Sequence, residues 1–183
     1  MDNGNNTLAS ASGTEPNPKS GKKNSLIGSL VVGILALIGV VNQTVDSGLV
    51  KYHNGFVKEA YNSILLENWN PMAEKIKGGT SNDNEIAAYL KANFIPEVQK
   101  WRKVAEETKP PSFAEEYHSR FQSDLVEMLT KAERVVSAIN KGDETAIAEN
   151  AKHLNDAVIQ IQTNYDKFRG RLATERNFTF EEK

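Results

Sequence analysis

The chain of 183 residues contains no cysteine, and its 22 basic residues are nearly balanced by 24 acidic ones. The lack of cysteine excludes disulfide bonds, thiolate metal ligands, a catalytic thiol and the lipid-bearing cysteine of a bacterial lipoprotein. Nucleic acid is not an expected partner, because binding to phosphates requires clustered Lys and Arg, and no such block occurs. The sequence also lacks the Gly-Xaa-Ser-Xaa-Gly elbow of hydrolases and the Gly-rich loops that bind phosphate. We therefore expect neither an enzyme nor a bound cofactor.

One long apolar run dominates the N-terminal part of the chain. Residues 26–41 read LIGSLVVGILALIGVV, and no charged residue stands between Asn24 and Val45. At ~1.5 Å per residue this uncharged stretch spans about 33 Å, enough to cross a hydrocarbon core of ~30 Å. Three lysines precede the run and only Lys51 follows it closely, so the positive-inside rule places the N-terminus in the cytoplasm. The sequence predicts a single-pass membrane protein whose C-terminal part is extracytoplasmic.

Cleavage of this segment as a signal peptide is the alternative. Val45, Asp46 and Ser47, followed by Gly48, offer small residues at which signal peptidase could cut after Ser47. Asp46 is charged, however, and the tail before the apolar run is long for a signal peptide. We expect a retained anchor, with a secreted helical protein as the alternative.

Small residues recur within the predicted anchor. Ser25, Ser29 and Gly33 are spaced by four, and Ala36 lies one turn further on. Such rows allow two membrane helices to approach closely, so these four residues are a candidate dimer face. Gly and Ser are also frequent in solitary membrane helices, which is the other interpretation of this row.

Beyond the anchor, apolar residues recur at helical spacing and no alternating strand pattern persists. The first expected helix runs from Val50 to Trp69, and its apolar row is spaced by four: Tyr52, Phe56, Ala60 and Ile64. Pro71 is expected to end this helix before a short piece from Met72 to Lys77. The second covers about residues 84–107 and begins with a capping box, Asn82 with Glu85. Pro96 lies in the middle of its apolar stripe and is expected to kink it.

The third and fourth helices carry the clearest patterns. Ser112 with Glu115 resembles a capping box that opens the third, and Gly142-Asp143 separates it from the fourth. The fourth helix shows eight apolar positions at heptad spacing: Ile147, Ala151, Leu154, Val158, Ile161, Tyr165, Phe168 and Leu172. Such a seam, with short connections, predicts an antiparallel four-helix bundle.

The predicted organisation is therefore all-α, with a transmembrane helix followed by an antiparallel four-helix bundle in which one helix is kinked by proline. We expect a disordered cytoplasmic tail over residues 1–24, a transmembrane anchor over residues 25–45, an extracytoplasmic bundle over residues 46–176 and a frayed C-terminus over residues 177–183.

One histidine lies in a pattern typical of metal-binding helical bundles. Glu115 and His118 form a Glu-Xaa-Xaa-His pair of the kind that ferritin-like bundles use twice for a di-iron site. The second pair is missing, because Asn150 stands three residues before His153 and Val50 three before His53. We expect no metal, and we interpret Glu115 as a solvated residue favoured by the helix dipole. Convergence of the three histidines on a zinc site or a pH sensor stays an alternative to surface positions.

Aromatic residues form the remaining candidate site. Trp69, Phe94, Trp101 and Tyr117 are candidates to line a ligand groove between helices, together with Phe113 and Phe121. The alternative is that these side chains are simply core.

The chain resembles uncharacterised single-span bacterial envelope proteins that carry an extracytoplasmic helical-bundle domain. The resemblance covers about residues 50–175 and depends on Ile95-Pro96, Trp101, Pro110-Pro111 and His118. It implies an envelope location and no activity. The expected function is protein interaction or envelope scaffolding, with membrane lipid and either another envelope protein or a second copy as partners. A ligand-sensing bundle that acts with a partner is the alternative.

Overall fold

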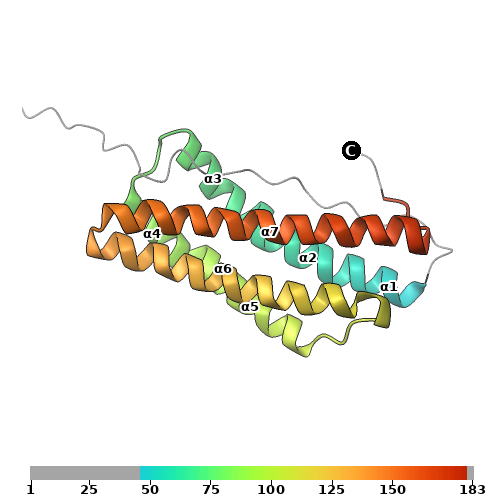
Figure 1. Ribbon diagram of the computed structural model, residues 1–183. Coiled ribbons are helices and arrows are strands. Elements are labelled where there is room, and N and C mark those ends of the chain that lie inside the picture. Colours follow the sequence, from blue (N-terminus) through green and yellow to red (C-terminus); the bar gives the residue numbers. More distant parts are fainter. Residues whose placement is uncertain (1–45, 181–183) are drawn as a thin grey trace, which may run out of the picture.

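The structure, a computed structural model, describes residues 46–180, and this part of the chain is all-helical (Figure 1). Four helical stretches and no β-strand are found between these limits, which confirms the expected all-α class. None of the helices described is both long and apolar enough to cross a membrane. The predicted tail, the anchor and the candidate dimer face of Ser25, Ser29, Gly33 and Ala36 lie outside the described residues.

The first helical stretch is continuous from Ser47 to Lys77. It comprises α1 (Ser47–Tyr52), the π-helical η1 (His53–Val57), α2 (Lys58–Tyr61), the π-helical η2 (Asn62–Trp69) and α3 (Asn70–Lys77). Asp46 caps its N-terminus, because its Oδ1 accepts the N–H of Gly48 at 2.9 Å and that of Leu49 at 3.3 Å. These two bonds satisfy N–H groups that have no partner within the helix.

The second stretch is continuous from Asp83 to Glu107. It comprises α4 (Asp83–Tyr89), the π-helical η3 (Leu90–Phe94) and α5 (Ile95–Glu107). The predicted capping box is confirmed: Asn82 Oδ1 accepts the Glu85 N–H at 3.0 Å, and Glu85 Oε2 accepts the Asn82 N–H at 3.1 Å.

Pro71 and Pro96, the prolines within the first and second helical stretches, each follow a π-helical turn. The N–H of Asn70, just before Pro71, donates to the carbonyl of Leu65, and that of Ile95, just before Pro96, donates to the carbonyl of Leu90. Each bond reaches back five residues, so the turn that precedes each proline is wider than an α-turn. The wider turn makes room for the proline ring, which would otherwise clash with a carbonyl in the preceding turn. The expectation that Pro71 ends the first helix was therefore wrong.

The third and fourth stretches are single long α-helices. A 3₁₀ turn, η4 (Ser112–Ala114), leads into α6 (Glu115–Lys141), and α7 (Glu144–Arg176) follows after a short turn. The capping box expected at Ser112 is not formed, because α6 begins after the 3₁₀ turn and Ala114 supplies no side-chain cap. Gly142 ends α6 in the left-handed region (φ 67°), which lets the chain reverse within two residues. Helix α7 ends at Arg176, where the predicted bundle ended, and the side chain of Phe178 is buried just beyond it.

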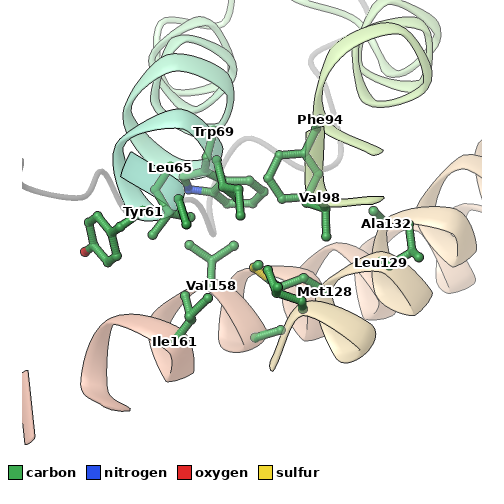
Figure 2. Close-up of a cluster of buried hydrophobic side chains, with 14 of the residues drawn as sticks. Tyr61, Leu65, Trp69, Phe94, Val98, Met128, Leu129, Ala132, Val158 and Ile161 are labelled. Carbon is green, nitrogen blue, oxygen red and sulfur yellow. The ribbon is translucent and has the colours of Figure 1, made fainter. Parts of the chain in front are cut away.

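The four stretches share one apolar core. Helices α6 and α7 lie side by side along most of their length, and α5 packs against α6 (Figure 1). Figure 2 shows one cluster to which all four stretches contribute, including Tyr61 and Trp69, Phe94, Met128 and Val158. All eight heptad positions predicted in the fourth helix are buried.

Candidate functional site

Two histidines and two tyrosines form hydrogen bonds inside the core. Tyr52 and His53 are adjacent in the sequence, at the junction of α1 and η1, yet their side chains reach different helices. Tyr52 bonds to His118 on α6, whereas His53 bonds to Tyr165 on α7. We call these four residues the histidine–tyrosine cluster. All four side chains are buried, and the cluster connects the first helical stretch to α6 and α7.

Both ring nitrogens of His118 are engaged. Its Nε2 lies 2.9 Å from the carbonyl oxygen of Ala105 on α5, and its Nδ1 lies 2.9 Å from the Tyr52 hydroxyl. A carbonyl only accepts, so Nε2 carries the proton and donates it, and Nδ1 accepts from Tyr52. The Gln122 amide also donates to the Ala105 carbonyl, at 3.0 Å. His118 therefore links α1 to α5 through its ring.

His53 is bonded in the same manner. Its Nδ1 lies 2.9 Å from Asn54 Oδ1 and its Nε2 lies 3.0 Å from the Tyr165 hydroxyl. Burial lowers the pKa of His53, and the positive charges of Lys58 and Arg169 lower it further, although the bond to Asn54 opposes this. Burial raises the pKa of the Tyr165 hydroxyl, which therefore keeps its proton and donates it to the neutral imidazole.

The sequence of the first helix contains a second row of apolar residues, beside the one predicted, and this row includes His53. The first helix was assigned one buried row, which begins at Tyr52 and continues every fourth residue. A second row runs beside it, and it is also buried: His53, Val57, Tyr61 and Leu65. A helix that is apolar on two adjacent rows is covered by two neighbours, and a histidine within such a row requires polar partners from them.

The histidines do not assemble a metal site. His118 has both nitrogens engaged, Glu115 is exposed, and His153 is only partly buried. Within residues 46–180 no group of three or more His, Cys, Asp or Glu side chains is placed to hold a metal ion. His53 and His118 occupy core positions, in contrast to the surface positions favoured from the sequence.

Further polar groups lie near the cluster. The hydroxyl groups of Tyr61 and Tyr117 are buried and have no hydrogen-bond partner among the described residues. Asp124 on α6 accepts a hydrogen bond from the Asn164 amide on α7 at 2.7 Å, and burial raises the pKa of this carboxyl. The core thus combines satisfied polar pairs between helices with two hydroxyls that contribute no hydrogen bond.

The four aromatic residues predicted to line a groove lie in three places. Trp69 and Phe94 are buried and contact each other, with ring centroids 5.6 Å apart. Trp101 packs on Phe56 at 6.1 Å, and its indole N–H donates to Glu97. Tyr117 stacks on Phe168 at 4.2 Å. The structure therefore brings only Trp69 and Phe94 into direct contact.

Two surface depressions lie near the N-terminal end of α1 and the paired ends of α6 and α7. A cleft of about 460 Å³ lies between α1 and the loop before η4, lined by Tyr52, Phe56 and Pro110 among others. A smaller hollow of about 240 Å³ lies between α6 and α7, and Tyr117 is the one predicted groove residue that lines it. Its basic lining was not anticipated, because Arg120 on α6 is distant in the sequence from Lys167 and Arg171 on α7 and meets them only when the two helices pair.

Comparison of the chain with protein-family models, with curated proteins and with solved structures found no match in any of the three. The roles of the residues described above are therefore inferred from their geometry and chemistry.

Proposed function

We propose that the chain is a membrane-tethered, non-enzymatic protein whose antiparallel four-helix bundle, with one helix bent at Pro96, is held outside the cytoplasm for protein interaction or scaffolding. The observation that carries this proposal is the use of the two buried histidines. Three of the four ring nitrogens of His53 and His118 form hydrogen bonds to another helix, and the fourth bonds to the adjacent Asn54. Both imidazoles are buried and are not accessible to a substrate. A buried and fully bonded polar network favours one rigid arrangement of helices, which suits a surface that presents partners with a fixed shape.

The position of Asp46 supports retention of the tether. Cleavage after Ser47 would remove Asp46, whose carboxylate caps α1. Loss of an N-cap costs about 1 kcal/mol of helix stability. A mature chain that begins at Gly48 would therefore start with a weakened first helix, directly before Tyr52 and His53. This consideration favours an anchor that stays attached over a cleaved signal peptide.

Membrane topology tests the first half of the proposal. The full-length chain, expressed in a bacterial host with a C-terminal alkaline phosphatase, is expected to stay in the membrane fraction after carbonate extraction and to give active phosphatase, an enzyme that works only outside the cytoplasm. Replacing Lys19, Lys22 and Lys23 by Glu should reduce the phosphatase activity, because it removes the charge that retains the N-terminus inside. A soluble mature protein beginning at Gly48 would contradict the tether.

Cross-linking tests the second half. Val126 on α6 and Ile159 on α7 are large apolar side chains that are 49% and 40% exposed. A photoreactive amino acid at either position should give one discrete adduct in native membranes, and a dimer-sized adduct identifies self-association. The same group at Glu74 on α3, an exposed charged position, serves as the control. Absence of an adduct at every exposed position of the helical domain would refute the interaction role.

A further inference from the structure

The hollow between α6 and α7 is basic at its rim. Arg120, Lys167 and Arg171 line it, and Glu116 is the one carboxylate in its lining. Glu116 bridges the two arginines: its Oε1 lies 2.9 Å from Nη2 of Arg120, and its Oε2 lies 3.1 Å from Nη1 of Arg171. Three cationic groups therefore surround a space of about 240 Å³. Two exposed carboxylates pair with them, Glu116 in the lining and Glu175 outside it, so one positive charge is left unbalanced.

Arg171 is held in place by more than this bridge. Its Nε donates to Glu175 at 3.1 Å, and its guanidinium lies 4.9 Å from the ring centroid of Phe113. A guanidinium fixed on several sides loses little further freedom when it binds an anion. Lys167 forms no ion pair within residues 46–180, so its ammonium group is available to an anion in the hollow.

The inner wall of the hollow is aromatic. The rings of Tyr117 and Phe168 stack at 4.2 Å between centroids, with only 9° between their planes, and both line the space. The buried amide of Asn164 lies beside them. The Tyr117 hydroxyl is buried and has no hydrogen-bond partner among the described residues. A space with cations at the rim and an aromatic inner wall matches a ligand with one charged end and one flat apolar end.

We propose that this hollow binds a small aromatic anion. The carboxylate or phosphate group of the ligand contacts Arg120, Lys167 and Arg171, and its ring packs against Tyr117 and Phe168. Arginine binds both kinds of anion through paired N–H donors. On binding, the anion replaces the Glu116 carboxylate as the partner of the two guanidinium groups. The site does not depend on the membrane tether, because all of its residues belong to α6 and α7.

Calorimetric titration of the full-length protein in detergent tests the proposal, with benzoate and phenyl phosphate as probes. We expect saturable binding of at least one of them, and none of benzyl alcohol or benzylamine, which share the ring without the negative charge. Lys167→Gln should weaken binding by about threefold to tenfold, the range for one partly exposed ion pair. The matched control is Lys152→Gln, which removes the same charge from an exposed position about 22 Å away along α7 and should leave the affinity unchanged.

Glu116→Gln distinguishes direct binding from structural damage, because damage would weaken anion binding whereas this variant should strengthen it. Removal of the competing carboxylate should tighten binding of the anion by about threefold or more, even though two surface ion pairs are lost. The side-chain amide signal of Asn164 in an NMR titration should shift with the same affinity. Equal binding by the wild type and Lys167→Gln, equal binding of benzyl alcohol and benzoate, or no saturable binding of either anion at millimolar concentration would overturn the proposal.

Discussion

Four buried tyrosines differ in what their hydroxyl groups contact. Tyr52 and Tyr165 each donate to a histidine on another helix, whereas the hydroxyls of Tyr61 and Tyr117 have no partner within residues 46–180. The rings of Tyr61 and Tyr165 contact each other, with centroids 5.5 Å apart, so both side chains are buried in the same part of the core. They form a matched pair in which only the hydrogen bond differs.

Tyr165→Phe and Tyr61→Phe should therefore change stability in different ways. Tyr165→Phe leaves Nε2 of His53 buried without a partner, which should lower the free energy of unfolding by about 1–3 kcal/mol. Tyr61→Phe removes a buried hydroxyl that makes no bond, so it should be neutral or stabilising by up to about 1 kcal/mol. Urea unfolding of both variants measures the difference, and equal destabilisation would show that the bond to His53 contributes nothing.

The lowered pKa of His53 predicts a dependence of stability on pH. The unfolded chain takes up a proton on this histidine near pH 6.5, whereas the folded chain does so only at lower pH. Between these two pKa values the unfolded state binds more protons, so stability is highest above about pH 6.5 and falls as the pH is lowered. The loss approaches about 1.4 kcal/mol per pH unit for one such group.

Denaturant unfolding between pH 8 and pH 5 measures this slope. His53→Gln should reduce the slope in the region just below pH 6.5, at the cost of lower stability at neutral pH. A wild-type protein whose free energy of unfolding stays constant over this range would contradict the assignment of a buried neutral His53.

At the scale of single elements, two glycines should respond in opposite directions to alanine. Gly142 ends α6 with φ 67°, a conformation that costs an L-residue about 1–2 kcal/mol. Gly170 lies within α7, and a Cβ added there meets no atom within 4 Å. Gly142→Ala should lower the melting temperature, whereas Gly170→Ala should raise it, because alanine favours a helix interior by about 1 kcal/mol. Melting temperatures that shift in the same direction would contradict these assignments.

The cap of α1 gives a second prediction at this scale. Asp46→Ala should lower stability by about 1 kcal/mol, because two N–H groups lose their acceptor. Asp46→Asn is the matched control, since asparagine caps about as well as aspartate without the charge. Thermal unfolding distinguishes them. Equal losses in the two variants would indicate that the charge matters and the cap does not.

The helices themselves were largely predictable from the sequence. The eight heptad positions of the fourth helix are buried as predicted. The first helix was divided wrongly at Pro71, because the sequence alone does not show that a π-helical turn precedes the proline. A proline is compatible with a helix break and with a wider preceding turn, and the apolar spacing does not distinguish the two.

At the scale of the whole molecule, one substitution tests whether the four stretches share a single core. Val158 is fully buried between the stretches in Figure 2, and Val158→Asp should cost at least about 4 kcal/mol, enough to abolish a cooperative melt. Ile159, the next residue, is 40% exposed, and Ile159→Asp should cost about 1 kcal/mol or less. Circular dichroism melts of the two variants test the assigned core. An unchanged melt in Val158→Asp would show that α7 is packed differently.

The candidate sites were less predictable than the core. The pairing of Tyr52 with His118 joins residues 66 positions apart, and the hollow requires α6 to meet α7 in one register. A buried row within one helix indicates that His53 needs polar partners, but it does not identify them, because the partners depend on the register in which two helices pack.

The bonds of Tyr52 and His53 have a mechanical consequence. Any pulling force transmitted to the described domain through Asp46 reaches α1 first, and these two residues lie within the first two turns of that helix. Tyr52 bonds to His118 on α6 and His53 to Tyr165 on α7, so separating α1 and η1 from the other helices requires both bonds to break. We therefore expect these two hydrogen bonds to oppose separation of the first helical stretch near the residue at which the described domain begins.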